Sequence, residues 1–231
     1  MPSVFPFRHL PLTVLLLAGC SHTPPPAAHD ATHSSASHHG AMPHRFEDAD
    51  AWAKRFEDPS RDEWQQPGKV VEALALPPDA KVADVGSGTG YFAVRLARAV
   101  PRGHVYGVDV EPDMGRYLGE RAKREGLTHL TPVLAEAADA RIPEPVDLVL
   151  VVDTYHHIGA REDYFRRLKA SLTPGGRLAI IDFRKGQPMG PPEEHKLAPE
   201  QVRQELEAAG WRLAEEHGFL THQYFLVFRP A

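Results

Sequence analysis

A glycine-rich loop is the first feature of the sequence that could hold a ligand. Residues 82–85 (VADV) have the composition of a strand, and Gly86–Gly90 (GSGTG) follow them directly before a helical pattern. Glycines at such a junction let the backbone turn sharply and approach a ligand closely, because no Cβ intervenes. A dinucleotide-binding loop has the spacing G-x-G-x-x-G, but Tyr91 stands where the third glycine would be. The spacing therefore argues against a nicotinamide dinucleotide.

A carboxylate at the end of the next strand is the second such feature. Residues 105–108 (VYGV) form a β-prone run that ends in Asp109. A carboxylate at this edge of a sheet can accept both hydroxyl hydrogens of an adenosine ribose, and its charge repels a 2′-phosphate. The glycine loop and the acid together predict a nucleoside site. The alternative is that Asp84 and Asp109 only cap their loops.

A run of polar residues, Asp153-Thr154-Tyr155-His156-His157, follows the fourth expected strand, at the edge where ligands bind in open α/β sheets. An imidazole there could take a proton near neutral pH, so Tyr155, His156 and His157 are the catalytic candidates. The alternative is that the histidine pair packs against the following segment and caps it. The Pro/Gly-rich segment 182–195 belongs to the same edge and is expected either to carry specificity or to be solvated.

The elements that must position these residues alternate between strand and helix. Residues 146–152 (VDLVLVV) are almost continuously apolar, which indicates a sheet covered on both faces and hence a parallel α/β fold. Residues 47–75 are expected to form one or two amphipathic helices, and residues 173–176 (TPGG) a turn. The expected strands are 81–85, 104–109, 131–135, 146–152, 177–182, 212–217 and 223–229, and the expected helices are 91–100, 113–125, 161–172 and 199–209.

With these motifs in this order, roughly residues 68–231 resemble the class I S-adenosylmethionine-dependent methyltransferases. The motifs that carry the resemblance are residues 84–90, 107–109, 146–149 with the later histidine pair, 172–176 and 208–211. The resemblance implies a Rossmann-like, seven-stranded, mostly parallel sheet with an antiparallel last strand and helices on both faces. It also implies S-adenosyl-L-methionine as cofactor, a methyl acceptor that we expect to be a small molecule, and residues 45–75 as an N-terminal helical lid.

The resemblance also assigns the cofactor-binding residues. Asp109 would bind the ribose, Asp84 would order the amino-acid end, and Asp153 would meet the methionyl ammonium group. Asp139 would lie along the adenine, although its loop leaves little room for the helix expected between the third and fourth strands. The full set of expected cofactor-binding residues is Asp84, Gly86, Ser87, Gly88, Gly90, Asp109, Val110, Asp139 and Asp153.

Composition excludes several other classes of function. The formal net charge of −5 argues against a nucleic-acid partner. The single cysteine, Cys20, rules out an internal disulfide framework and a multi-cysteine zinc site, and no metal site is expected in the folded domain. The sequence gives no sign of a protein partner.

The N-terminal residues have the pattern of a targeting segment. An apolar run from Leu10 to Ala18 is too short to span a bilayer, and residues 17–20 (LAGC) resemble the lipobox of bacterial lipoproteins. We expect residues 1–19 to be a signal peptide, Cys20 to be lipidated, and residues 20–44 to be a flexible His/Pro/Ser-rich tether. The folded domain would then span 45–231 and face the periplasm, anchored in the outer membrane by analogy with lipoproteins that have Ser21 at this position.

Two alternatives stay open at this stage. S-adenosylmethionine is a cytosolic compound, so translation from Met42 would give a cytoplasmic protein and remove the conflict with a lipid anchor. A non-catalytic, lipid-anchored module that binds a nucleoside, or a metal through the histidines of residues 22–44, is the alternative function.

Overall fold

The computed structural model describes residues 48–231. The predicted signal peptide, Cys20, the tether and the predicted domain start at residue 45 all lie outside the described residues. No helix between residues 48 and 231 is long and apolar enough to cross a membrane.

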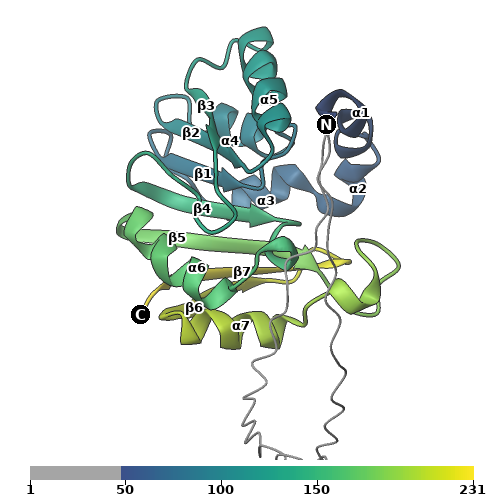
Figure 1. Ribbon diagram of the computed structural model, residues 1–231, viewed down its shortest axis with the longest axis vertical. Helices are drawn as coiled ribbons and strands as arrows, with labels where there is room; N and C mark the ends of the chain where they lie inside the picture. The colour runs from purple at the N-terminus through teal and green to yellow at the C-terminus, as the bar shows by residue number, and fades with distance from the viewer. Residues whose placement is uncertain (1–47) are drawn as a thin grey trace, which may run out of the picture. The chain divides into compact units, whose positions relative to one another are not determined.

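Within residues 48–231, seven strands form one sheet in the order β3-β2-β1-β4-β5-β7-β6 (Figure 1). Strands β1 to β5 pair in parallel, and β7 runs antiparallel to both β5 and β6. The predicted seven-stranded sheet with an antiparallel last strand is therefore confirmed. The strands are β1 Lys81–Val85, β2 His104–Asp109, β3 Leu130–Leu134, β4 Val146–Val152, β5 Leu172–Phe183, β6 Trp211–His217 and β7 Gln223–Pro230.

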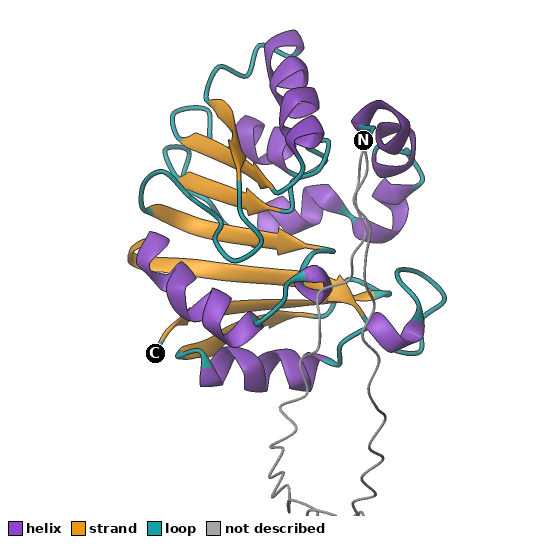
Figure 2. Cartoon of the chain, in the orientation of Figure 1, coloured by secondary structure: helices purple, strands orange, loops and turns teal. Residues whose placement is uncertain are grey.

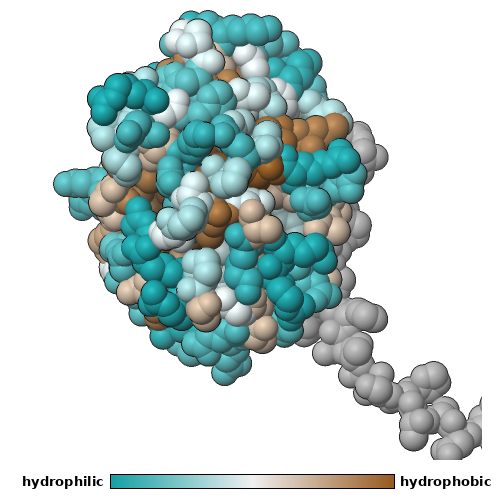
Figure 3. Space-filling view, turned by 90° about the vertical axis from the view of Figure 1, so that its left-hand side faces the viewer, coloured by the Kyte–Doolittle hydropathy of each residue, from teal (hydrophilic) through white to brown (hydrophobic). Residues whose placement is uncertain are grey.

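The strand order reverses beside β1, and this reversal positions the site. The chain continues from β1 to β2 on one side, whereas β4 pairs with the other side of β1, with Val85 opposite both Val108 and Val151. In open α/β sheets such a switch point leaves a crevice at the carboxyl ends of the strands. The opposite edge, where the strands begin, faces the viewer in Figure 3 and is covered mainly by hydrophilic residues.

Helices cover both faces of the sheet, as predicted (Figure 2). The helices α3 Pro67–Ala73, α4 Ala93–Ala99 and α5 Pro112–Arg124 share one apolar core with the sheet, and α6 Arg161–Leu168 and α7 Pro199–Ala208 share the other. Helix α7 has Pro at its first position and is followed by Gly210 in the left-handed region (φ 83°). Proline suits the backbone conformation of the first helical position, and glycine suits the left-handed conformation just after the helix end.

Three short helices replace the one or two predicted for residues 47–75. They are α1 Ala49–Phe56, α2 Arg61–Gln65 and α3, and Gln66, between α2 and α3, has a φ of 45°. Pro67 cannot extend α2 because it lacks an N–H group, but it is favoured at the first position of α3. The chain bends there, and α1 and α2, which we call the lid helices, lie at the carboxyl edge of the sheet (Figure 1).

Two connections differ from a simple alternation of strand and helix. Residues 135–145, between β3 and β4, contain no helix, in agreement with the short length noted in the sequence; a single bridge joins Glu136 to Asp139. Residues 173–176, predicted as a turn, form a bulge inside β5, because the pairing with β4 jumps from Val146–Leu172 to Leu148–Arg177.

Candidate active site at the carboxyl edge

The glycine loop after β1 has the conformation that its composition predicts. Gly86 and Gly88 have φ values of 76° and 52°, in the left-handed region that side chains rarely adopt. A Cβ on Gly86 would lie 2.7 Å from Cβ of Thr154, which follows β4, so the two loops pack backbone against side chain. At Gly88 the nearest atoms to such a Cβ belong to the Phe56 ring of α1, at 3.5 Å. The lid helices therefore close directly on the glycine loop.

Asp109 is fixed by the backbone around it. Its Oδ2 accepts a hydrogen bond from the Gly88 N–H at 2.8 Å, and its Oδ1 accepts one from the Glu111 N–H at 3.0 Å. Burial raises the pKa of Asp109, and the two N–H groups oppose that rise. A carboxylate oxygen has two lone pairs, so each oxygen can still accept one hydroxyl hydrogen. This geometry suits the two hydroxyl groups of a ribose.

Apolar side chains flank this carboxylate. In the described part of the chain, the exposed large hydrophobic residues are Val110, directly after Asp109, and Leu134, at the end of β3. The Ala135 N–H donates to the Asp109 carbonyl oxygen at 2.8 Å, which brings the end of β3 beside the acid. A flat base attached to a ribose on Asp109 would find Val110 and Leu134 beside it.

Three buried polar atoms near the glycine loop have no hydrogen-bond partner within residues 48–231. They are Asp84 Oδ2, Ser87 Oγ and Thr89 Oγ1. Burial raises the pKa of Asp84 to about 7, the charge of Asp109 adds to the rise, and Arg61 opposes it. Since buried polar groups are costly without partners, the three atoms indicate a polar ligand or ordered water at this loop. Together with Asp109 they fit S-adenosylmethionine.

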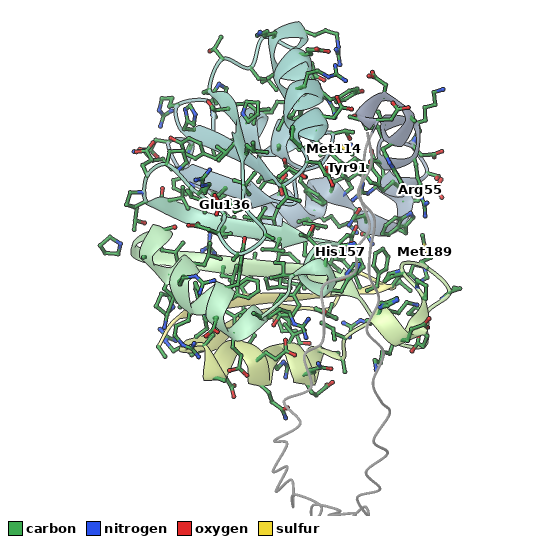
Figure 4. The ribbon with its side chains drawn as sticks, in the orientation of Figure 1. Arg55, Tyr91, Met114, Glu136, His157 and Met189 are labelled. Carbon is green, nitrogen blue, oxygen red and sulfur yellow. The ribbon has the colours of Figure 1, made fainter. Side chains whose placement is uncertain are left out.

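In the loop after β3, Ala135 is the residue that contacts Asp109, through its backbone N–H. Asp139 is exposed, and its Oδ1 accepts the Arg141 N–H at 2.8 Å within the loop. Glu136 follows Ala135 directly and forms an ion pair with Arg141 at 2.9 Å (Figure 4). Cofactor contact by Asp139 stays a prediction.

Two of the three catalytic candidates are buried and bonded to the chain itself. Tyr155, which begins the 3₁₀ turn η1 (Tyr155–His157), is fully buried and donates its hydroxyl hydrogen to Glu205 Oε2 at 2.8 Å. His156 Nδ1 lies 2.9 Å from both carboxylate oxygens of Asp182 on β5. Burial lowers the pKa of His156, but the hydrogen bond and charge of Asp182 outweigh burial and leave it raised.

His157 is partly exposed, and its ring centre lies 4.1 Å from that of His156, whose side chain is 4% exposed (Figure 4). The hydrogen bond between His156 and Asp182 therefore connects η1 to β5. Catalytic roles for Tyr155, His156 and His157 stay predictions.

Asp153 is held by side chains that the sequence did not single out. Its Oδ2 accepts hydrogen bonds from Arg61 Nη2 at 3.2 Å and Gln65 Nε2 at 3.1 Å, and its Oδ1 accepts one from Gln223 Nε2. Burial raises the pKa of Asp153 to about 6, although Arg61 pulls it down. The three partners lie between 70 and 92 positions away in the sequence, so no local pattern could have revealed them. Contact between Asp153 and a methionyl ammonium group stays a prediction.

Ion pairs attach the lid helices to the rest of the domain. Asp50 contacts Arg116 at 3.0 Å and Glu57 contacts Arg121 at 2.9 Å, which joins α1 to α5. The Arg61 guanidinium also lies 4.0 Å from the centre of the Tyr91 ring, and Tyr91 is labelled in Figure 4. These contacts hold the lid helices at the carboxyl edge.

The segment after β5 forms part of the same edge. The Arg184 N–H and Nε donate to the carbonyl oxygens of His222 and Gln223, each at 2.9 Å, so this arginine ties the segment to β7. Phe183, which ends β5, has its ring centre 5.8 Å from that of Trp64 on α2. Phe183 and Trp64 therefore form an aromatic pair beside the Asp153 cluster.

Comparison with known proteins agrees with this geometry. Residues 82–176 match the family described as "Methyltransferase domain". This part of the chain is similar to methyltransferase domains. A solved S-adenosylmethionine-dependent methyltransferase from Aquifex aeolicus is 29% identical with a TM-score of 0.73, over 78% of this chain and 98% of that one. The glycine loop, Asp109 and the unpartnered polar atoms of this chain fit S-adenosylmethionine, the compound on which that solved methyltransferase depends.

Curated relatives belong to the same class. A protein-L-isoaspartate O-methyltransferase of Aeropyrum pernix is 29% identical over 66% of this chain and 58% of its own length. A demethylmenaquinone methyltransferase of Deinococcus radiodurans is 31% identical over 49% of this chain and 47% of its own. The chain thus spans about half the length of the curated relatives it matches.

Proposed function

We propose that this chain is an active S-adenosylmethionine-dependent methyltransferase with a small-molecule acceptor. The observation that carries the proposal is Asp109, whose two oxygens are held by backbone N–H groups and keep free lone pairs at the switch point of the sheet. Relatives named for small molecules, such as the demethylmenaquinone methyltransferase and an erythromycin O-methyltransferase of Saccharopolyspora erythraea, support the acceptor class. The net charge of −5 also disfavours a nucleic-acid acceptor.

The residues of the edge have separate tasks in this function. The cofactor supplies a methyl group on a positively charged sulfur, so the donor needs no further activation. Asp109 fixes the ribose hydroxyls, and the carboxylates of Asp84, Asp109 and Asp153 favour a cation at the edge. The lid helices exclude water and hold the reactants in line, which supplies most of the acceleration of a direct displacement.

Binding of the donor tests this proposal first. S-adenosylmethionine and S-adenosylhomocysteine are titrated calorimetrically into the full chain, kept in mild detergent because residues 10–18 are apolar. We expect micromolar binding that Asp109→Ala abolishes and that Asp79→Ala, at an exposed loop position, leaves intact. Absence of binding in the folded wild-type protein would overturn the proposal.

Turnover separates an enzyme from the alternative nucleoside-binding module. Release of S-adenosylhomocysteine is followed with a panel of small phenols, amines and quinols as acceptors. Catalytic release with one of them is the expected result. Tight donor binding without turnover across the panel favours the module. In the described residues, no group of three or more His, Cys, Asp or Glu side chains could hold a metal ion.

We also propose that lipidation of Cys20 anchors the protein to a bacterial membrane, facing the periplasm. The support is the sequence alone: the apolar run before Cys20 and the LAGC motif. Mass spectrometry of the N-terminus of the native protein tests it. A diacylated or triacylated Cys20 is expected, and a chain that begins at Met42 would instead indicate a cytoplasmic protein.

A further inference from the structure

One oxygen of the Asp153 carboxylate, Oδ1, is directed to the β7 side of the carboxyl edge. Its backbone N–H donates to the Ile181 carbonyl oxygen of β5 at 2.9 Å, and its Oδ1 accepts from Gln223, the first residue of β7. Strand β7 lies beyond β5, on the side opposite to β1. The next residue, Thr154, is the one that packs against Gly86. Thr154 therefore packs on the glycine loop, whereas Asp153 Oδ1 is directed to β7; its Oδ2 is bonded to Arg61, which lies over the Tyr91 ring.

The groups around Asp153 form a built polar site. Gln65 and Gln223 are both fully buried, and the amide of Gln65 also donates to Gln223 Oε1 at 3.2 Å. Burying two amides and a guanidinium group costs free energy unless they are bonded, and here all three are arranged around one carboxylate. Their positions hold that carboxylate in a fixed direction.

Asp153 can still bind one more hydrogen. Gln223 is the hydrogen-bond donor to Oδ1 within the described residues, which leaves a lone pair on that oxygen. The side chain is 21% exposed, so a molecule at the edge can reach it. The aromatic pair of Trp64 and Phe183 lies on the same side, since Phe183 pairs with Gln223 across the β5–β7 ladder. The part of the carboxyl edge next to β7 therefore combines two apolar rings, those of Trp64 and Phe183, with one hydrogen-bond acceptor, Asp153 Oδ1.

We propose that Asp153 is a catalytic residue that binds the methyl acceptor through an O–H or N–H group and takes its proton. The inference rests on the proposed methyltransferase function. In the transfer, the bond between the methyl carbon and sulfur breaks and its electron pair stays on sulfur. A bond forms between the methyl carbon and the acceptor oxygen or nitrogen, and the proton of that atom passes to Asp153 Oδ1. The acceptor class is a hydroxyl or amine compound with an apolar or aromatic body.

The electrostatics of the cluster suit this role. Burial raises the pKa of Asp153, Arg61 lowers it, and the charge of Asp182 raises it again, while the Gln65 hydrogen bond and His156 lower it. The resulting value of about 6 leaves the carboxylate mostly ionised at neutral pH, yet close enough to that pH to take a proton.

Sinefungin tests the proposal without knowledge of the natural acceptor. It is an S-adenosylmethionine analogue with an amine in place of the transferable methyl group, so its amine occupies the region that the acceptor atom approaches. Dissociation constants of sinefungin and S-adenosylhomocysteine are measured for the full chain in detergent. We expect the wild-type protein to bind sinefungin at least tenfold more tightly. Asp153→Asn should reduce this preference to less than threefold and change S-adenosylhomocysteine binding by less than threefold.

Two comparisons keep the outcomes distinct. Asp109→Asn should weaken both ligands by the same factor, because both have the ribose. If Asp153→Asn also weakens both ligands equally, Asp153 holds the methionyl ammonium group and the proposal is overturned. Persistence of the sinefungin preference in Asp153→Asn, or its absence in the wild type, overturns it as well. A wild-type protein that binds neither ligand refutes the proposed function itself.

The pH dependence of the wild-type protein provides a test that requires no substitution. Arg61, Asp182 and His156 are the charged or titratable groups that act on Asp153 from the surrounding elements. The sinefungin preference should decrease at least threefold between pH 7.5 and pH 5, because Asp153 becomes protonated. A preference that stays constant across this range contradicts the proposal.

Discussion

Substituting Gly86 by Ala tests whether the contact between the two loops of the edge determines the sequence there. Two costs add at this position. A non-glycine residue with a positive φ costs about 1–2 kcal/mol. In addition, the new Cβ would lie 2.7 Å from Thr154 Cβ and closer still to its Oγ1 and Cγ2, well inside the 3.0 Å that real Cβ atoms respect. Overpacking of this kind costs about 1–3 kcal/mol.

Gly126 provides a matched control for the first cost. It has a φ of 70°, close to the 76° of Gly86, but a Cβ there would meet no atom within 4 Å. Gly126→Ala should therefore lower the free energy of unfolding through backbone strain alone. We expect Gly86→Ala to lower it by about 1–3 kcal/mol more than Gly126→Ala.

Urea unfolding followed by tryptophan fluorescence measures both variants. The double variant Gly86→Ala/Thr154→Gly removes the clashing side chain and should recover the excess loss, which appears as a coupling energy between the two sites. The reasoning is refuted if the two alanine variants unfold within about 0.5 kcal/mol of each other, or if the two substitutions at the edge prove additive.

Three further predictions concern the charged groups of the edge. Asp109→Asn should weaken S-adenosylmethionine and S-adenosylhomocysteine binding alike, by about 10- to 100-fold in calorimetry, because a hydrogen bond to a charged group is lost; unequal losses would place the residue elsewhere than at the ribose. The free energy of unfolding should decrease as pH rises from about 4 to 7, because the raised pKa values of Asp84 and Asp153 make the folded protein bind more protons than the unfolded chain. Asp84→Asn should flatten this slope in urea titrations, and an unchanged slope would contradict the assignment. Asp182→Asn should lower the pKa of His156 in an NMR titration, because burial then acts without the carboxylate that opposes it.

The sequence predicted the sheet well because its strands are defined by local composition. Strands β1, β2 and β4 have the predicted limits, since each is an apolar run that ends at a glycine or an aspartate. The glycine loop and Asp109 could be located for the same reason: both directly follow such runs. The bulge in β5 could not be predicted, because Pro174-Gly175-Gly176 has the composition of a turn and only the pairing with β4 keeps it in the strand.

The surroundings of Asp153 and His156 depend on contacts between residues that are far apart in the sequence. Arg61, Gln65 and Gln223 have no motif around them, and their role is visible only once α2 and β7 meet the end of β4. Likewise, the sequence could place His156 at the correct edge but could not show that Asp182 binds its ring. Burial and long-range pairing, rather than local pattern, determine these environments.

Ion pairs hold the lid helices in place. The salt concentration of the medium should therefore affect how readily a ligand reaches the carboxyl edge of the sheet. Arg116 and Asp50 are 44% and 70% exposed, so dissolved ions screen their attraction over a Debye length of about 10 Å at 0.1 M. Arg61 and Asp153, at 15% and 21%, are screened much less. At high salt the exposed Asp50–Arg116 pair is expected to weaken first, while the more buried Arg61–Asp153 and Glu57–Arg121 pairs persist. We therefore expect the residence time of a bound ligand to shorten as ionic strength rises.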